Sequence, residues 1–230
     1  MNHNLDEILY DILKCLASSN APVIFKGALL TRLIVKDNPY NISRSTRDID
    51  ADWNGEKLTI SELENYLNIA LKQLSGVELK AFRDYDEKIS AGFIVYLNHE
   101  EIATLDLDMR KNNHYQLYDI DGVKFKGSTV DNILADKIYV ISNNYLLRRT
   151  KDLIDIYVLS SMVDIDVNKI LLILHDKNRM LGDFDALINR KDEVKHAYET
   201  LRLINNKPSF DNVYKVAIAI YQLFNKKEAW

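Results

Sequence analysis

Acidic and apolar residues alternate strictly over residues 48–53, and this is the clearest pattern in the chain. Successive side chains of a β-strand point to opposite faces of its sheet. The alternation therefore predicts a strand that carries Asp48, Asp50 and Asp52 on one face and apolar residues on the other.

A second alternation covers residues 102–109, where Asp106 and Asp108 lie between apolar residues. The same two-residue period predicts a strand with both carboxylates on one face. If this strand is the neighbour of 48–53, its carboxylates lie about 5 Å from those of the first strand. Either Asp106 or Asp108 then joins the first cluster as the third carboxylate, and we expect Asp108.

Before residue 128, stretches with a helical period are mixed with stretches that favour strands. Residues 5–17 repeat apolar positions three and four apart, as amphipathic helices do. Thr59 and Glu62 form a capping box for a helix that we expect to end near Leu74. Strands are expected at 23–25, 77–82, 89–98, 101–109, 115–120 and 123–125, and a further helix begins at Gly27.

Beyond residue 128 the pattern is helical throughout. Ser128 with Asp131 predicts the cap of a helix that ends near residue 142. Further helices are expected at 149–162, 166–176, 191–204 and 210–225. These patterns predict an α+β chain with a mixed, mainly antiparallel sheet in a domain 1–127 and an all-helical C-terminal domain 128–230.

The composition is that of a folded protein rather than of a membrane span or a disulfide-rich scaffold. The 230 residues are 47% hydrophobic, which is enough for a core, and include a single cysteine. No run of eighteen apolar residues exists, and residues 1–7 lack the basic and apolar segments of a signal peptide. We therefore expect a cytoplasmic protein without a membrane partner. The net charge of -4 does not by itself indicate a nucleic-acid partner.

Three carboxylates on one face of a strand repel one another. The repulsion is about 1 kcal/mol per pair at ~4 Å in water, and several times more in a partly dry site. Such a face is therefore either an exposed edge solvated by water or a site that binds a cation. Oxygen ligands of an Asp-x-Asp pair suit Mg²⁺ that carries a substrate phosphate, and Mn²⁺ is the other candidate ion. Three converging carboxylates can hold two such ions roughly 4 Å apart.

Gly27 stands where the strand 23–25 turns into a helix. The first turn of a helix presents free backbone N–H groups and the positive end of the helix dipole, which together bind phosphate. A glycine at such a turn is also explained by its conformational freedom alone. The turn is therefore a candidate phosphate site that needs support from other residues.

Lys137 has apolar helical neighbours on both sides, an unusual setting for a charge. Either its stem extends along the helix to place the ammonium in water, or the ammonium reaches a phosphate beside the core. Asp152 and Asp155 lie close to Arg149 at helical spacing. These carboxylates either pair with the basic residues one turn away or orient Lys137.

Taken together, these residues resemble the AbiEii/AbiGii abortive-infection toxins and the related MenT toxins, within the polymerase-β-like nucleotidyltransferase superfamily. The resemblance spans about residues 23–160. It rests on residues 25–28, on Arg44, Thr46, Asp48 and Asp50, on Asp106 and Asp108, and on Asp136-Lys137 followed by residues 148–156. It implies a polymerase-β-like nucleotidyltransferase core followed by a helical module.

The resemblance implies that a nucleoside monophosphate is transferred from an NTP to an acceptor, with tRNA 3′ ends as acceptors in part of the family. It also implies the toxin of a toxin–antitoxin or abortive-infection system, with a cognate antitoxin as partner. By motif matching, the catalytic residues are Asp48, Asp50, Asp108, Lys137 and Asp152, and the metal ligands are drawn from Asp48, Asp50, Asp106 and Asp108. The expected nucleotide contacts are Lys26, Gly27, Ala28, Arg47 and Lys137. The family usually has Gly-Gly or Gly-Ser where this chain has Gly27-Ala28, so its hold on the phosphates is expected to differ.

Two other functions fit the same residues. A small-molecule nucleotidyltransferase, of the kind that adenylylates antibiotics, uses the same carboxylates but has an acidic cleft for a cationic acceptor and no dependence on RNA. A non-catalytic member of the fold would bind RNA or protein without consuming an NTP. For an RNA acceptor, backbone contacts are expected from Arg44, Arg47, Arg110, Lys111, Lys124, Lys126, Arg148 and Arg149.

Overall fold

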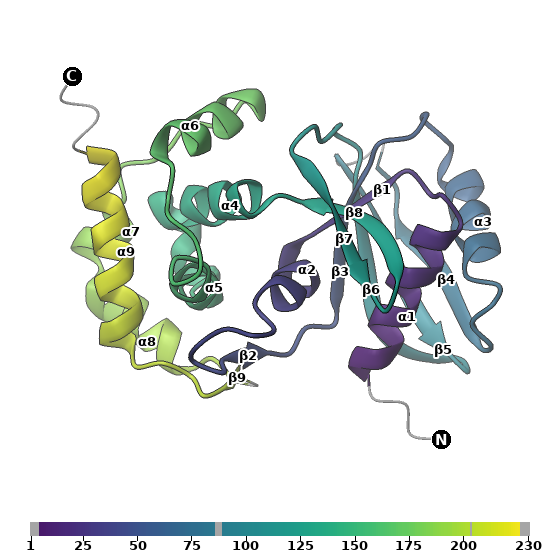
Figure 1. Ribbon diagram of the computed structural model, residues 1–230, viewed down its shortest axis with the longest axis horizontal. Coiled ribbons are helices and arrows are strands. Elements are labelled where there is room, and N and C mark those ends of the chain that lie inside the picture. Colours follow the sequence, from purple (N-terminus) through teal and green to yellow (C-terminus); the bar gives the residue numbers. More distant parts are fainter. Residues whose placement is uncertain (1–4, 86–88, 203, 226–230) are drawn as a thin grey trace. The chain divides into compact units, whose positions relative to one another are not determined.

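A mixed seven-stranded sheet is the main feature of the computed structural model, which describes residues 5–85, 89–202 and 204–225 (Figure 1). In spatial order the strands are β4 (Val77–Arg83), β5 (Ser90–Leu97), β6 (Glu100–Asp108), β3 (Asp48–Trp53), β1 (Val23–Lys26), β8 (Val123–Ser128) and β7 (Tyr115–Ile120). The pairs β1–β8 and β3–β6 are parallel, and the other neighbours are antiparallel. The predicted α+β class with a mixed sheet is therefore confirmed.

The chain divides into two compact units. One consists of Met1–Leu30 and Thr46–Thr129 and contains the sheet together with helices α1 (Leu5–Ser18) and α3 (Ile60–Ala70). The other consists of Thr31–Ser45 and Val130–Trp230. Residues 31–45 thus group with the helical part of the chain, and the predicted division into domains 1–127 and 128–230 stays a prediction.

The apolar face of β3 forms part of the core of the first unit. Ile49, Ala51 and Trp53 are buried, and the Trp53 ring packs edge-to-face on Tyr66 of α3 at a centroid distance of 5.6 Å. Helix α1 packs on β8 and α3 on β4, so both helices serve this unit's core. The predicted capping box is present, because Thr59 and Glu62 each bond the other's backbone N–H, which stabilises the start of α3.

The second unit is mainly helical. Its elements after residue 129 are α4 (Val130–Ser142), the 3-10 helix η1 (Asn144–Arg148), α5 (Lys151–Leu159), α6 (Val167–Asp176), α7 (Asp185–Asn189), α8 (Lys191–Glu199), β9 (Ile204–Asn205) and α9 (Phe210–Asn225). Strand β9 pairs antiparallel with β2 (Ser43–Arg44). The unit boundary falls inside α2 (Gly27–Ile34), which starts directly after β1.

Several local predictions differ from the structure. The helix expected at 149–162 is shorter and spans Lys151–Leu159. The helix that begins after Thr59 ends at Ala70 rather than near Leu74, and the helix expected at 191–204 ends at Glu199. Residue 203 lies outside the described residues. Ser128, expected as a helix cap, is the last residue of β8, where its hydroxyl accepts a hydrogen bond from Asn112. The two-residue strand β9 and the short α7 were not expected, because each is too short to show a period.

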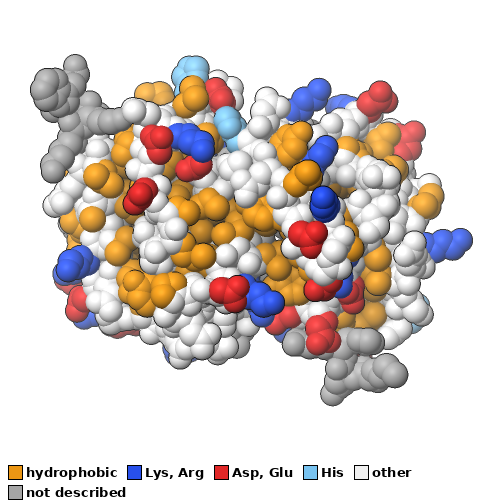
Figure 2. Space-filling view, viewed as in Figure 1, with side chains coloured by type: hydrophobic (Ala, Val, Ile, Leu, Met, Phe, Trp, Pro, Cys, Tyr) orange, Lys and Arg blue, Asp and Glu red, His pale blue; other side chains and the backbone are white. Residues whose placement is uncertain are grey.

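Several large hydrophobic side chains are exposed on both units, and the face in Figure 2 shows such side chains among charged ones. Leu117 is 65% exposed in the first unit, and Met180 is 86% exposed in the second. Scattered exposed hydrophobic residues are normal on soluble domains, so they do not by themselves mark an interface. Within the described ranges, none of the helices has both the length and the apolar character that a membrane crossing requires.

Candidate active site

The two aspartate strands are neighbours in the sheet of the first unit. In the parallel pair β3–β6, Asp50 lies opposite Asp106 and Asp52 lies opposite Asp108. Neighbouring strands are about 4.8 Å apart, and residues in register point to the same face. The expectation that the two acidic runs share one face is therefore confirmed. This face is opposite the one that buries Ile49 and Ala51.

Gly27 lies directly against Asp50. The backbone of Gly27 has a φ of +68°, and a β-carbon added there would be 2.0 Å from Asp50 Oδ2. Only glycine fits both the backbone conformation and this close approach. Because Gly27 is also the first residue of α2, the start of a helix stands beside the Asp-x-Asp strand. Ala28 follows in the first turn of that helix.

Asp48 is the most exposed carboxylate of β3 and is held by two threonines. Its Oδ1 accepts a hydrogen bond from the Thr104 hydroxyl at 3.2 Å, and its backbone N–H donates to the Thr46 hydroxyl at 3.1 Å. Thr46 is buried, so this turn is fixed by the interior of the chain. These bonds fix the position of Asp48 and leave its carboxylate accessible to a ligand.

Asp106 is paired with Arg83, whose guanidinium reaches it from β4 across the intervening strand β5. Gly92 on β5 is in register with Asp106, and a β-carbon there would be 2.7 Å from the Phe82 ring and 3.2 Å from Arg83 Cζ. The missing side chain at residue 92 thus leaves room for the guanidinium. Arg83 also donates to Ser90 through its Nε and a terminal nitrogen, at 3.0 and 3.1 Å.

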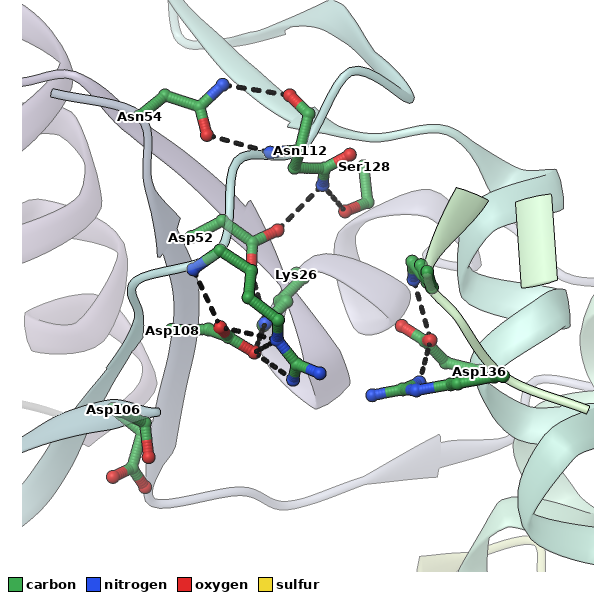
Figure 3. A network of polar contacts seen from close by, with 12 residues as sticks. Lys26, Asp52, Asn54, Asp106, Asp108, Asn112, Ser128 and Asp136 are labelled. Atoms are coloured by element: carbon green, nitrogen blue, oxygen red, sulfur yellow. Dashed lines mark hydrogen bonds and ion pairs between the residues drawn. The ribbon is translucent and has the colours of Figure 1, made fainter. Parts of the chain in front are cut away.

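Asp52 and Asp108 are held by basic residues of the protein (Figure 3). The Lys26 ammonium pairs with Asp52 and lies 3.4 Å from Asp108 Oδ2, and Arg110 grips Asp108 with contacts of 2.6 to 3.2 Å. The pKa of Asp52 is raised, because the effect of burial is larger than the lowering effect of the nearby Lys26 charge. Burial also acts to raise the pKa of Asp108, but the bonds from Arg110 and the charge of Lys26 outweigh it and lower the value to about 2.

Asp52 and Asp108 form the inner pair of the acidic face. Asn112, in the loop that follows β6, connects Asp52 to the surrounding structure. Its amide donates to Asp52 Oδ2 at 2.7 Å and to the Ser128 hydroxyl at 3.2 Å. Asn54 and Asn112 exchange two further bonds of 2.8 and 2.9 Å. Both oxygens of the buried Asp52 are therefore satisfied by protein groups.

No group of three His, Cys, Asp or Glu side chains among the described residues is arranged to hold a metal ion. The aspartates of β3 nevertheless suit a single Mg²⁺ ion that takes only some of its ligands from the protein. Mg²⁺ is commonly bound by one or two carboxylates, with water and substrate phosphates completing its shell. Asp48 and Asp50 supply two carboxylates on the exposed part of β3, beside the start of α2, and so fit this mode.

Lys137 is the centre of a buried ion cluster in the second unit. Its ammonium lies 2.6 Å from Asp152 Oδ1 and 2.7 Å from Asp155 Oδ2. Arg44 of β2 pairs with Asp155 at 3.1 Å, and Arg149 Nε lies 2.9 Å from Asp152 Oδ2. Both predicted alternatives for these carboxylates are therefore seen as contacts: Asp152 and Asp155 bind Lys137, and Asp152 also pairs with Arg149 one turn away. An orienting role in catalysis stays a prediction. The alternative that the ammonium extends into water is wrong, because the Lys137 side chain is 6% exposed.

The pKa values in this cluster move in the directions that favour the charged forms. Burial alone would lower the pKa of Lys137, but the charges of Asp152 and Asp155 raise it. Burial would raise the pKa of Asp155, but Lys137 and Arg44 lower it. The cluster is therefore an ionised network that connects β2, α4 and α5.

The sequence reasoning missed the partners of the carboxylates. It assigned Lys26 to the nucleotide, and it gave no role to Arg83, Asn112 or Asn54. Alternation shows which face a side chain occupies but not how far a long side chain reaches along that face. A basic residue at the end of the strand before the glycine turn was the one available signal, since Lys26 falls on the acidic face. Arg47 is exposed, and its predicted nucleotide contact stays a prediction.

Solved structures of two other proteins resemble this chain, and one of these proteins is named as nucleotidyltransferase-like. The antibiotic-resistance factor ANT(2'')-Ia, in its solution structure, is 15% identical, with 85% of this chain and 97% of that chain covered and a TM-score of 0.48. An antigenic nucleotidyltransferase-like protein from Paracoccidioides brasiliensis is 16% identical, with 84% and 91% covered and a TM-score of 0.47. ANT(2'')-Ia in complex with adenylyl-2''-tobramycin is 14% identical, with 75% and 96% covered and a TM-score of 0.45.

No protein-family model and no curated protein matches this sequence. At the identities above, counterpart residues in other proteins do not define roles for residues of this chain. Its chemistry follows from the geometry of its own side chains.

Proposed function

We propose that this protein is a metal-dependent nucleotidyltransferase that moves a nucleoside monophosphate from an NTP to an acceptor. One observation carries the proposal: Gly27, at the start of α2, touches the carboxylate of Asp50 on β3. A helix start favours phosphate, and carboxylate oxygens favour a divalent cation. A triphosphate with its cation needs both kinds of group side by side.

Asp48 and Asp50 would hold Mg²⁺ or Mn²⁺, with Asp106 as the third carboxylate. Each of the two candidates is paired with an arginine, Asp106 with Arg83 and Asp108 with Arg110. We favour Asp106, because it is the register partner of Asp50 and because Asp108 also lies beside Lys26. When bound there, the ion would lower the pKa of the attacking hydroxyl and neutralise the triphosphate. Catalysis of this kind depends mainly on position and charge.

The backbone N–H groups at Gly27 and Ala28 would steady the phosphates. In this proposal Lys137 and Asp152 have a structural role: their ion pair inside the second unit holds α4 on α5. The triphosphate contact predicted for Lys137 would need this network to open. That contact is therefore proposed only as a step that accompanies binding of the NTP.

For the acceptor we favour the tRNA 3′ end, which fits the toxin of a toxin–antitoxin system with a cognate antitoxin. Support comes from exposed basic residues on both units that remain available for phosphate contacts: Lys111, Lys124, Lys126 and Arg148. Arg44 and Arg110 are less suited, because they pair with Asp155 and Asp108. A small cationic acceptor, as in antibiotic adenylylation, is the second candidate, since the acidic face would attract it.

The test is to incubate the purified protein with each labelled NTP, Mg²⁺ and total tRNA, and to follow the label. Transfer of label to tRNA supports the proposal, and transfer to an added aminoglycoside supports the second candidate. NTP-binding calorimetry with and without Mg²⁺ identifies a non-catalytic binder. Absence of both transfer and Mg²⁺-dependent NTP binding would refute the proposed function.

A further inference from the structure

Lys26 is enclosed by two carboxylates of the acidic face. Its ammonium forms an ion pair with Asp52 and lies 3.4 Å from Asp108 Oδ2 (Figure 3). The side chains of Lys26, Asp52 and Asp108 are 23%, 7% and 14% exposed, so water screens their charges weakly. A positive charge of the protein thus occupies the place between two acidic groups that a metal ion would otherwise occupy.

The charges at this inner end of the face balance without any ligand. Asp52 and Asp108 contribute two negative charges, and Lys26 and Arg110 contribute two positive charges. Asn112 satisfies the second oxygen of Asp52. A divalent cation would have to displace an ammonium that is already paired, so it would gain little here.

The outer end of the same face is more exposed to solvent, since the side chain of Asp106 is 35% exposed and that of Asp108 is 14% exposed. The outer end holds Asp48, Asp50 and Asp106, and Arg83 pairs with Asp106. Asp48 is exposed and its carboxylate takes a hydroxyl hydrogen bond from Thr104. Figure 3 shows Asp106 apart from the group around Lys26. The face is therefore divided into an inner part closed by protein cations and an outer part where the carboxylates of Asp48 and Asp106 are more exposed to solvent.

We propose that Lys26 is the built-in counter-ion of Asp52 and Asp108, so that these inner carboxylates bind no divalent ion. Mg²⁺ or Mn²⁺ then binds at the outer carboxylates Asp48, Asp50 and Asp106. This part of the proposal rests on the proposed function. Lys26 is a positioning residue in this scheme. It is the last residue of β1, so its bond to β3 also holds Gly27 on Asp50.

The test uses the full chain without nucleotide and measures the number of bound Mn²⁺ ions by electron paramagnetic resonance. Lys26→Met removes the ammonium and leaves two shielded carboxylates with a gap between them. These oxygens are ligands that Mn²⁺ accepts. We expect the variant to bind one Mn²⁺ more per chain than the wild type. Addition of Asp52→Asn should return the count to the wild-type value.

Lys14→Met is the matched control. It removes one positive charge from the same unit, but the partners of Lys14, Asp11 and Asp121, have side chains that are 46% and 79% exposed. We expect this variant to keep the wild-type Mn²⁺ count. An equal gain in the Lys14 and Lys26 variants would show a general effect of net charge and would overturn the proposal.

An unchanged Mn²⁺ count in folded Lys26→Met also overturns it. If that single variant does not fold, the comparison moves to the double variant with Asp52→Asn, which carries no excess buried charge. A folded double variant then supports the counter-ion role, and equal unfolding of both contradicts it. The proposed function fails separately, when the wild type transfers no nucleotide and Asp48→Asn leaves the Mn²⁺ count unchanged.

Discussion

Gly27 and Asp50 share one small space, because the carboxylate of Asp50 fills the volume that a side chain at residue 27 would need. The contact connects the end of β1 to the Asp-x-Asp strand. It makes the glycine a requirement of the site rather than only of the turn.

Gly27→Ala should be one of the more destabilising single changes in the first unit. The positive φ costs an alanine about 1–2 kcal/mol, and displacing Asp50 adds roughly 1–3 kcal/mol through overpacking. Gly122→Ala is the control, since its φ is +83° but nothing lies within 4 Å of the added carbon. Urea unfolding should show the larger loss for Gly27→Ala. Equal losses would mean that Asp50 moves aside freely.

Asp48→Asn should abolish nucleotide transfer and leave the free energy of unfolding within about 1 kcal/mol of the wild type. The change removes a charge that repels its neighbours while keeping the hydrogen bond from Thr104. Transfer from labelled NTP and urea unfolding are measured on the same preparations. Asp37→Asn, at an exposed position of the second unit, should change neither. Parallel loss of fold and activity in Asp48→Asn would make Asp48 a structural residue.

Lys137→Met should cost about 3–5 kcal/mol of stability, because it removes the buried cation that bonds both Asp152 and Asp155 and leaves each of these buried carboxylates with one arginine. Lys177→Met is the comparison. Lys177 pairs with the partly exposed Asp136, which keeps Arg179 at 2.6 Å, so a loss of about 0–1 kcal/mol is expected there. Chemical denaturation distinguishes the two. A loss below 1 kcal/mol in Lys137→Met would refute the structural role of this cluster.

The lowered pKa of Asp155 predicts a dependence of stability on pH in the acid range. The ordinary value is 3.8 and the folded value lies below it, so the folded state binds its proton less tightly than the unfolded chain. This contribution is present above pH 3.8 and is lost as the pH falls below it. Asp155→Asn removes the group, so its stability should fall less steeply in this window. Identical slopes by circular dichroism would contradict the assignment.

If RNA is the acceptor, Lys124→Ala/Lys126→Ala should weaken its binding at low salt. Loss of two phosphate contacts to a single strand should reduce the slope of log affinity against log salt by roughly 1.4. Lys72→Ala/Lys195→Ala removes two exposed lysines, one in the turn after α3 and one in α8, and serves as control. Filter binding at several salt concentrations measures the slope. A slope that changes equally in both variants would exclude the β8 lysines as a specific contact.

The sequence was sufficient for the face of each strand that holds the carboxylates, because the two-residue period is a local pattern. The register between the two strands became known only from the structure. The sequence was also insufficient for the partners of the carboxylates. The register partner of Lys26 on β3 is Asp50, but its side chain extends diagonally to pair with Asp52. The side chain of Arg83 crosses β5 at Gly92. Such contacts depend on the order of strands, which alternation does not determine. The misplaced cap at Ser128 has the same origin, since a paired strand competed with the helix for that residue.

The parallel pairing of β3 with β6 also determines when the acidic face can exist. Parallel neighbours require a crossover, and here α3, β4 and β5 all lie between the two strands in the chain. A nascent polypeptide therefore lacks Asp106 beside Asp50 until synthesis has passed β6 and the whole crossover has folded. Fragments that end before residue 106 should lack the proposed transferase activity, which would begin only with an almost complete first unit.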